Sequence, residues 1–182
     1  KGHVPQYRAL PFSGFWQPIK YPWHVLSLMN HFLKSFVGYS QPRKNVVIAK
    51  SATISGDVYL AEGVRVLDNA VIQGPAYIGK NTVIATNTLV RQSHIGENCV
   101  IGFGSEVARS YVGDNVWTHT NYIGDSIIGS DVSFGAGTVT GNLRLDEKSV
   151  KVKISKTWNG KSEEAAIDSG LTKLGLITGD HI

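Results

Sequence analysis

The sequence predicts an all-β protein whose main part is a parallel β-helix of six-residue units. An aliphatic residue recurs at every sixth position from Ile54 to Val90, and a small or β-branched residue stands two positions before each. A helix repeats every 3.6 residues and a strand every two, so neither produces this period. Hexad repeats are typical of β-helices, in which each unit forms one flat side of a coil. The predicted inward residues are Ile54, Leu60, Val66, Ile72, Ile78, Ile84 and Val90.

The repeat continues beyond Val90 with one-residue slips. Three sides per coil make a coil of about eighteen residues, so residues 52–140 would form about five coils. An antiparallel sandwich, the alternative, does not hold a fixed period over so many units. Glycines that follow inward residues, such as Gly79 and Gly96, would adopt positive φ at the corners. The later inward positions are predicted at Ile95, Ile101, Val107, Val112, Trp117, Ile123, Ile128 and Phe134.

A capping helix is expected before the first coil, over about residues 22–36. Pro22 suits a helix start, and apolar residues follow it at spacings of three and four. Because the exposed end of a β-helix needs a cap, we expect this helix to cover the first coil. We therefore divide the N-terminal part into residues 1–21, which read as the tail of an absent domain, and residues 22–45, a linker with the capping helix.

The hexad pattern stops near residue 142, which makes 46–142 the predicted β-helix domain. Val150, Val152 and Ile154 then alternate with polar residues in a period-two strand, and a polar stretch runs from Asn159 to Glu164. We expect a protruding strand and loop over 143–172. Residues 173–182 resemble the start of a further coil.

The charge and the cysteine content of the chain indicate which kinds of molecule it would bind and in which compartment it would work. Net charge is +4 and the sequence pI is about 9.2. Lysines cluster between residues 148 and 161, which favours an anionic small molecule, and no nucleic-acid-binding motif accompanies them. No apolar run approaches the ~20 residues of a membrane span. The single cysteine, Cys99, stands at a small inward position and excludes an internal disulfide framework, which favours a cytoplasmic setting.

The most distinctive segment outside the repeat runs from Trp117 to Asp125. It contains His119-x-x-Tyr122-x-Gly124-Asp125, and Phe134-Gly135-Ala136-Gly137-Thr138 and Asn142 follow. This block resembles the acetyltransferase region of the bifunctional sugar-1-phosphate nucleotidyltransferase/glucosamine-1-phosphate N-acetyltransferases. The archaeal-type branch is the most similar, because residues 142–152 and the helix near residues 22–26 also match it.

That resemblance implies a left-handed β-helix that assembles as a homotrimer in the cytoplasm. It implies transfer of an acetyl group from acetyl-CoA, as co-substrate, to the amine of a hexosamine 1-phosphate, with no metal required. Glucosamine 1-phosphate and galactosamine 1-phosphate both remain open as substrates. The complete protein would also join the product to a nucleotide, and residues 1–21 would be the tail of its nucleotidyltransferase domain.

The resemblance also assigns roles to individual residues. His119, which the hexad register places on the outside, would be the catalytic base. From spacing alone, an outward histidine is usually a solvated surface residue. An imidazole that titrates near neutral pH suits proton transfer from an amine. The substrate-binding residues would be Tyr122, Asn142, Lys148, Lys151 and Arg91. The acetyl-CoA-binding residues would be Ala136, Gly137 and Asn142, with backbone N–H groups of the turn available to an oxyanion.

Three positions depart from the family pattern and leave a second function open. Ala108 and Arg109 stand where a lysine is usual, and Ser133 replaces an asparagine. A non-catalytic β-helix that only trimerises or regulates a nucleotidyltransferase is therefore the alternative. A γ-class carbonic anhydrase would need three zinc histidines, and the repeat contains only His94 and His119.

Overall fold

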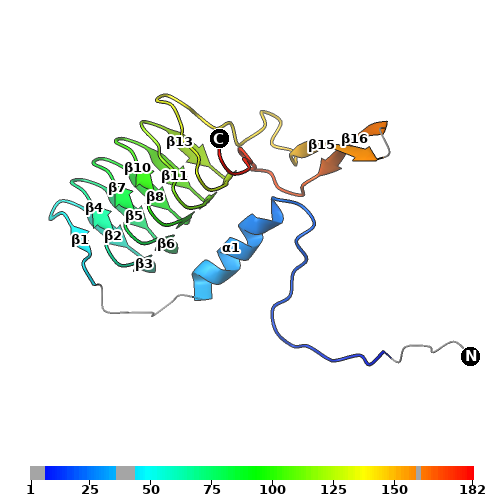
Figure 1. Ribbon diagram of the computed structural model, residues 1–182, viewed down its shortest axis with the longest axis horizontal. Coiled ribbons are helices and arrows are strands. Elements are labelled where there is room, and N and C mark those ends of the chain that lie inside the picture. The colour runs from blue at the N-terminus through cyan, green and yellow to red at the C-terminus, as the bar shows by residue number, and fades with distance from the viewer. Residues whose placement is uncertain (1–6, 36–43, 159–160) are drawn as a thin grey trace, which may run out of the picture.

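A computed structural model of the chain describes residues 7–35, 44–158 and 161–182. Figure 1 shows a solenoid of stacked coils, with helix α1 (His24–Ser35) alongside it and a two-stranded hairpin at its C-terminal end. Strands of successive coils pair in parallel to form three sheets. The solenoid is a left-handed β-helix of about five turns, which confirms the predicted fold class.

Each of the first four coils contributes one short strand to each sheet, and we name the sheets A, B and C. Sheet A contains β1 (Val47–Ile48), β4 (Arg65–Val66), β7 (Val83–Ile84) and β10 (Val100–Ile101). Sheet B contains β2 (Thr53–Ser55), β5 (Val71–Gln73), β8 (Leu89–Arg91), β11 (Glu106–Ala108) and β13 (Tyr122–Gly124). Sheet C contains β3 (Val58–Leu60), β6 (Ala76–Ile78), β9 (His94–Ile95), β12 (Tyr111–Val112) and β14 (Ile127–Ile128).

Columns of aliphatic side chains fill the inside of the solenoid. In sheet B, for example, Ile72 lies in register with Val90, and Val90 with Val107. All three side chains are fully buried, whereas Ile54 in the first coil is half-buried. Burying such a side chain stabilises the fold by about 1.5–3 kcal/mol. The predicted inward register is thus confirmed from Ile54 to Val112.

The register expected at Trp117 was wrong by one residue. Trp117 is 61% exposed, and its neighbours Val116 and Thr118 are buried. Trp117 pairs with the outward residue Val100 of sheet A, so Thr118 takes the inward position below Ile101. The hydroxyl of Thr118 accepts a hydrogen bond from the Gly102 N–H at 2.8 Å, which lets a polar side chain occupy this position.

The glycines after inward residues do not supply the positive φ values that we expected. Those values fall mainly on polar corner residues, at Asn81, Asn87, Gln92, Asn98, Arg109, Asn115, Asp125 and Asp131. Gly79 and Gly96 are needed for a different reason. A Cβ at Gly79 would lie 2.4 Å from the backbone of Gly96, and a Cβ at Gly96 would lie 2.4 Å from the Gly113 carbonyl oxygen. These glycines let successive coils approach closely.

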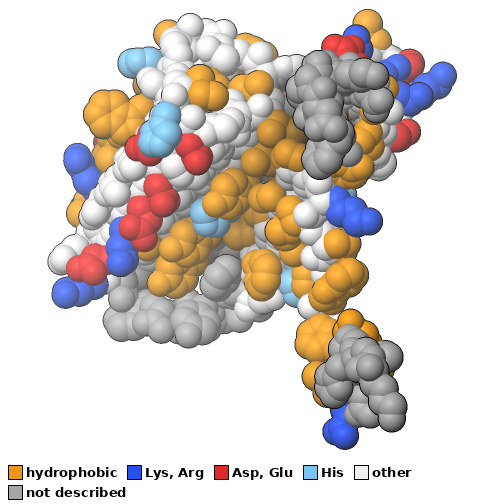
Figure 2. Space-filling view, turned by 45° about the vertical axis from the view of Figure 1, so that its right-hand side comes forward, with side chains coloured by type: hydrophobic (Ala, Val, Ile, Leu, Met, Phe, Trp, Pro, Cys, Tyr) orange, Lys and Arg blue, Asp and Glu red, His pale blue; other side chains and the backbone are white. Residues whose placement is uncertain are grey.

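Helix α1 covers a side of the solenoid and not its first coil, so the expected cap was wrong. Leu26, Met29 and Leu33 form an apolar stripe on the helix and pack in one cluster with Tyr111 and Ile127 of sheet C. Figure 2 shows hydrophobic side chains gathered between the solenoid and the helix. The expected last residue of the helix, Phe36, lies outside the described residues.

The outer face of sheet C explains why the helix packs there. A ladder of stacked rings runs along it, with ring centroids about 5 Å apart, through Tyr59, Tyr77, His94 and Tyr111. An aromatic face of this kind offers an amphipathic helix a continuous apolar surface to bury. The sequence pattern identified the apolar stripe of the helix but not the surface that it meets.

The chain leaves the solenoid after residue 142 and returns to it near the C-terminal end. Strands β15 (Lys151–Trp158) and β16 (Lys161–Asp168) form an antiparallel hairpin, so part of the polar stretch expected as a loop is a strand. Ile177 then pairs in parallel with Ile127, and the Ser133 N–H donates to the Ile182 carbonyl. No helix in the described residues is long and apolar enough to span a membrane.

Candidate active site

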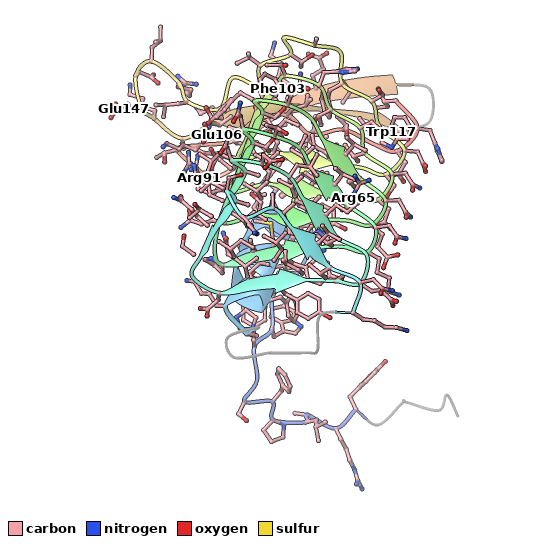
Figure 3. All side chains as sticks on the ribbon, turned by 90° about the vertical axis from the view of Figure 1, so that its left-hand side faces the viewer. Arg65, Arg91, Phe103, Glu106, Trp117 and Glu147 are labelled. Atoms are coloured by element: carbon pink, nitrogen blue, oxygen red, sulfur yellow. The ribbon has the colours of Figure 1, made fainter. Side chains whose placement is uncertain are left out.

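His119 lies at the corner between sheets A and B, in a groove of about 330 Å³. We call this the A/B corner groove. Figure 3 looks along the solenoid and shows Phe103 at this corner, with Trp117 on one side and Arg91 and Glu106 on the other. The groove is lined by Ala85, Val100, Gly102, Phe103, Trp117, Thr118, His119, Thr120 and Ser133.

Two buried polar side chains hold the backbone of His119 in place. Asn121 Oδ1 accepts the His119 N–H at 2.7 Å, and Ser105 Oγ donates to the His119 carbonyl at 2.5 Å. Within the described residues the imidazole itself has no hydrogen-bond partner, and residue 119 is exposed. The backbone is therefore fixed while the ring is available to a bound molecule.

The turn with Ala136 and Gly137 lies one coil below His119 and is bonded to the same loop. Asn121 Nδ2 donates to the Gly135 carbonyl at 2.8 Å, and the Gly137 N–H donates to the Thr120 carbonyl at 2.9 Å. Ala136 and Gly137 are both exposed. The N–H of Gly137 is thus already used, whereas neither the Gly135 N–H nor the Ala136 N–H has a hydrogen-bond acceptor among the described residues.

Tyr122 and Asn142 meet on the outside of sheet B. Asn142 Nδ2 lies 3.1 Å from Tyr122 Oη and 2.5 Å from Asp125 Oδ2. Asp125 also accepts two hydrogen bonds from Arg109, at 2.6 and 2.7 Å. These bonds to Asp125 raise the pKa of Arg109. Two expected substrate-binding residues are therefore hydrogen-bonded to each other, and Asn142 is also bonded to the carboxylate of the Arg109–Asp125 ion pair.

Arg91 lies on the same side of the solenoid but is already paired. Its guanidinium lies 2.7 Å from Glu106 Oε1, and both side chains are about 30% exposed. Figure 3 shows Glu147, in the segment after Asn142, projecting on this side too. Lys148 and Lys151 follow in that segment and are exposed. The charge of Arg91 is thus shared with Glu106, and within the described residues no hydrogen bond or ion pair joins Lys148 or Lys151 to Arg91.

Sequence reasoning missed the roles of Arg109, Asp125 and Asn121 in this arrangement. Arg91 and Arg109 are eighteen residues apart and Asp125 follows sixteen residues later, which is about one coil each time. Residues one coil apart stack in a β-helix, so this spacing was a signal for the ion pair. Asn121 gave no such signal, because only the fold shows that it is buried between two loops.

The two histidines of the repeat lie on different sides of the solenoid. His94 belongs to the ring ladder of sheet C, whereas His119 lies at the A/B corner. In the described part of the chain, no three His, Cys, Asp or Glu side chains form a group that could hold a metal ion.

Comparison with known proteins identifies relatives of the chain. The chain is 37% identical over 186 residues to the bifunctional protein GlmU of Methanococcus vannielii, an alignment that covers 96% of this chain and 39% of the relative. It is 36% identical over 179 residues to a bifunctional sugar-1-phosphate nucleotidylyltransferase/acetyltransferase of Sulfurisphaera tokodaii, covering 96% and 41%. Over the region that it spans, the chain is homologous to these bifunctional enzymes.

The matched region is the C-terminal part of these bifunctional enzymes, of whose length the chain spans about two fifths. No family model matches the chain. Among solved structures, a perosamine N-acetyltransferase from Caulobacter crescentus, determined with CoA and GDP-perosamine, is similar with a TM-score of 0.47 and 21% identity. That similarity covers 52% of this chain and 48% of the other.

Proposed function

We propose that this region transfers an acetyl group from acetyl-CoA to the amine of a hexosamine 1-phosphate. The observation that carries the proposal is the 37% identity to GlmU over 96% of the chain. Its relatives are bifunctional nucleotidylyltransferase/acetyltransferases, and the part of them that this chain matches forms the β-helix. The exposed imidazole of His119 in the A/B corner groove supplies the required base.

The reaction needs one proton acceptor near the amine. The amine nitrogen attacks the thioester carbonyl, a C–N bond forms, and the C–S bond breaks as the tetrahedral intermediate collapses. His119 takes a proton from the nitrogen as the C–N bond forms, and CoA leaves as the thiolate and is then protonated. A positioned base of this kind contributes about 10²–10⁴-fold to the rate.

The turn at Ala136 and Gly137 is the proposed acetyl-CoA contact. A glycine lets the pantetheine approach the backbone closely, since no side chain stands in the way. The N–H of Ala136 would donate to the oxyanion of the intermediate. Because Asn121 bonds this turn to the His119 backbone, the base and the oxyanion donor are held at a fixed relative position.

The sugar phosphate would bind on the sheet B side of the groove. Lys148 and Lys151 act as point charges for the phosphate, and Arg91 adds a charge shared with Glu106. Tyr122 and Asn142 contact the sugar, and Asn142 lies where the two substrates meet. The choice between glucosamine and galactosamine would depend on the polar groups that face the hydroxyl at the epimeric carbon.

We further propose that the protein works as a cytoplasmic homotrimer. The A/B corner groove is open on one chain, and a second copy beside it would enclose acetyl-CoA between two solenoids. The ring of His119 has no partner in the described residues, which leaves space for groups of a neighbouring copy. The preceding domain of the complete protein would then transfer a nucleotide to the acetylated product.

A direct assay separates this proposal from a β-helix that only assembles the protein. The purified protein is given acetyl-CoA with glucosamine 1-phosphate or galactosamine 1-phosphate, and both thiol release and the N-acetylated product are measured. We expect turnover with at least one sugar and a loss of about 10²–10⁴-fold in kcat for His119→Ala. No turnover by the wild type would support the non-catalytic alternative, and unchanged kcat in the variant would remove His119 from the mechanism.

A further inference from the structure

The amide nitrogen of Asn142 is held between two acceptors that fix its orientation. Nδ2 lies 2.5 Å from Asp125 Oδ2 and 3.1 Å from Tyr122 Oη. An ionised carboxylate only accepts hydrogen bonds, so the amide must turn its NH₂ group toward Asp125. Its two N–H bonds are then both used, one by the carboxylate and one by the phenol oxygen.

The amide oxygen of Asn142 is consequently directed away from this network. No hydrogen bond to Asn142 Oδ1 occurs in the described residues, and no unpartnered side-chain oxygen or nitrogen there is buried. Oδ1 is therefore accessible from outside. The site presents a hydrogen-bond acceptor at this point and cannot present a donor unless the amide rotates.

Asp125 is itself held by Arg109 from the coil above. The two carboxylate oxygens accept from Nε and a terminal nitrogen of the guanidinium, a bidentate pair with fixed geometry. Asp125 is nearly buried, at 9% side-chain exposure, and Arg109 is at 25%. Both are corner residues with positive φ, and the Asp125 N–H donates to the Ala108 carbonyl. The carboxylate thus has one position, set by two coils.

We propose that Arg109 and Asp125 are positioning residues that orient Asn142 so that its Oδ1 accepts an N–H of the acceptor amine. The inference rests on the proposed function. A neutral primary amine has two N–H bonds and one lone pair. The lone pair attacks the thioester carbon, one N–H proton passes to His119, and the second N–H donates to Asn142 Oδ1.

This arrangement favours an amine over a hydroxyl at the same carbon. A hydroxyl has a single proton, so it can satisfy either the base or Asn142 but not both. Leaving a site's polar group without its partner weakens binding of the wrong substrate strongly.

The same ion pair bears on the position where the family usually has a lysine. Arg109 does not replace that lysine as a phosphate-binding charge, because the charge of Arg109 is neutralised by Asp125.

A double-mutant cycle tests the inference on the purified protein. Asp125→Asn keeps the size of the side chain but removes the carboxylate, which frees the Asn142 amide to rotate. We expect kcat/KM for the amino-sugar phosphate to fall by about 10- to 100-fold, with the KM for acetyl-CoA within about twofold of the wild type. In the Asn142→Ala background, Asp125→Asn should have no further effect, because the group that it orients is gone.

Two further variants make the result decisive. Arg109→Lys keeps the charge but loses the bidentate contact, and it replaces Asp125→Asn if that variant does not fold. It should lower kcat/KM in the wild-type background and have no further effect in the Asn142→Ala background. Asp68→Asn is the matched control. Asp68 lies at the far end of the solenoid and also accepts a hydrogen bond from a side chain of a neighbouring coil, from Ser51 Oγ at 3.0 Å. This control should leave kcat/KM unchanged.

The outcomes also separate this inference from the proposed function. An active wild type with additive effects of the two substitutions overturns the positioning role and leaves acetyl transfer in place. An active wild type whose Asp125→Asn effect disappears in the Asn142→Ala background supports the positioning role. A wild type with no turnover on either amino-sugar phosphate overturns both.

Discussion

Asn121 and Gly135 are joined by a hydrogen bond of 2.8 Å that connects the loop of His119 to the turn of Ala136 and Gly137. The same side chain accepts the His119 N–H at 2.7 Å, so one buried amide contacts both halves of the proposed site. Its donor and acceptor ends can be tested separately.

Asn121→Ala should lower both stability and activity. The substitution leaves the His119 N–H without its acceptor, while the Gly135 carbonyl keeps its bond from Thr138 Oγ1 at 2.9 Å. Losing the two bonds of the buried amide costs about 1–3 kcal/mol of unfolding free energy. We expect kcat to fall more than the KM of either substrate, because the base and the oxyanion donor lose their fixed spacing. Chemical denaturation and steady-state kinetics measure the two effects.

Asn121→Asp is the matched variant. A carboxylate keeps the acceptor for His119 but cannot donate to Gly135, so its effect isolates the contact to the turn. Wild-type kinetics and stability in both variants would show that Asn121 does not join the two loops.

Gly79→Ala should destabilise the solenoid by about 1–3 kcal/mol, because the added methyl meets backbone atoms of Gly96 at 2.4 Å. Gly141→Ala is the control, since a Cβ at Gly141 meets nothing within 4 Å. The control should change the free energy of unfolding by no more than about 0.5 kcal/mol. Equal effects of the two substitutions would argue against close packing of the glycine column.

His94 should make the protein less stable in mild acid. Burial disfavours its charged form and lowers the pKa of His94 below the ordinary value of 6.5. Below about pH 6.5 the unfolded chain therefore binds a proton that the folded protein does not, and stability falls as the pH falls. The slope from this group reaches about 1.4 kcal/mol per pH unit at most.

His94→Phe keeps a ring between Tyr77 and Tyr111 and removes the titrating group. We expect the variant to lose less stability than the wild type between pH 7 and pH 5 in urea denaturation. Tyr111→Phe, which keeps both the ring ladder and the imidazole, should retain the wild-type acid slope. Parallel pH curves for the wild type and His94→Phe would contradict this explanation.

Cys99 should not react with thiol reagents in the folded protein. Its side chain is fully buried, and burial raises the pKa of the thiol to about 11, so little thiolate forms at pH 8. A disulfide reagent such as 5,5′-dithiobis(2-nitrobenzoic acid) should label the protein only after denaturant is added. Rapid labelling of the folded state would show that this part of the core opens easily.

The solenoid could be predicted from the hexad repeat, because a fixed period determines which side chains face inward. The predicted register failed at Trp117, because the hydrophobic indole was expected to face inward. Thr118 takes the inward position instead, and its hydroxyl accepts a hydrogen bond from the Gly102 N–H of the coil above. Hexad spacing also identified the corners, but it could not distinguish glycines needed for close approach from polar residues with positive φ.

Elements outside the repeat were harder to predict for two reasons. The apolar stripe of α1 was visible, but the ring ladder that it covers consists of outward residues that the hexad analysis left aside. The sequence Asn159-Gly160 is a strong signal for a hairpin turn, but the sequence analysis treats it only as part of a polar stretch. In the site, the motif indicated His119, Tyr122 and Asn142. The spacing of about one coil between Arg109 and Asp125 was a signal for their ion pair, whereas only the fold shows that Asn121 is buried between two loops.

The central claim is that His119 takes the proton during acetyl transfer. The most direct test compares a single turnover of enzyme-bound acetyl-CoA with glucosamine 1-phosphate in the wild type and in His119→Asn, with substrate binding measured in both. We expect unchanged binding and an acetyl-transfer step slower by about 10²–10⁴-fold in the variant. An equally fast transfer step in His119→Asn would contradict the mechanism.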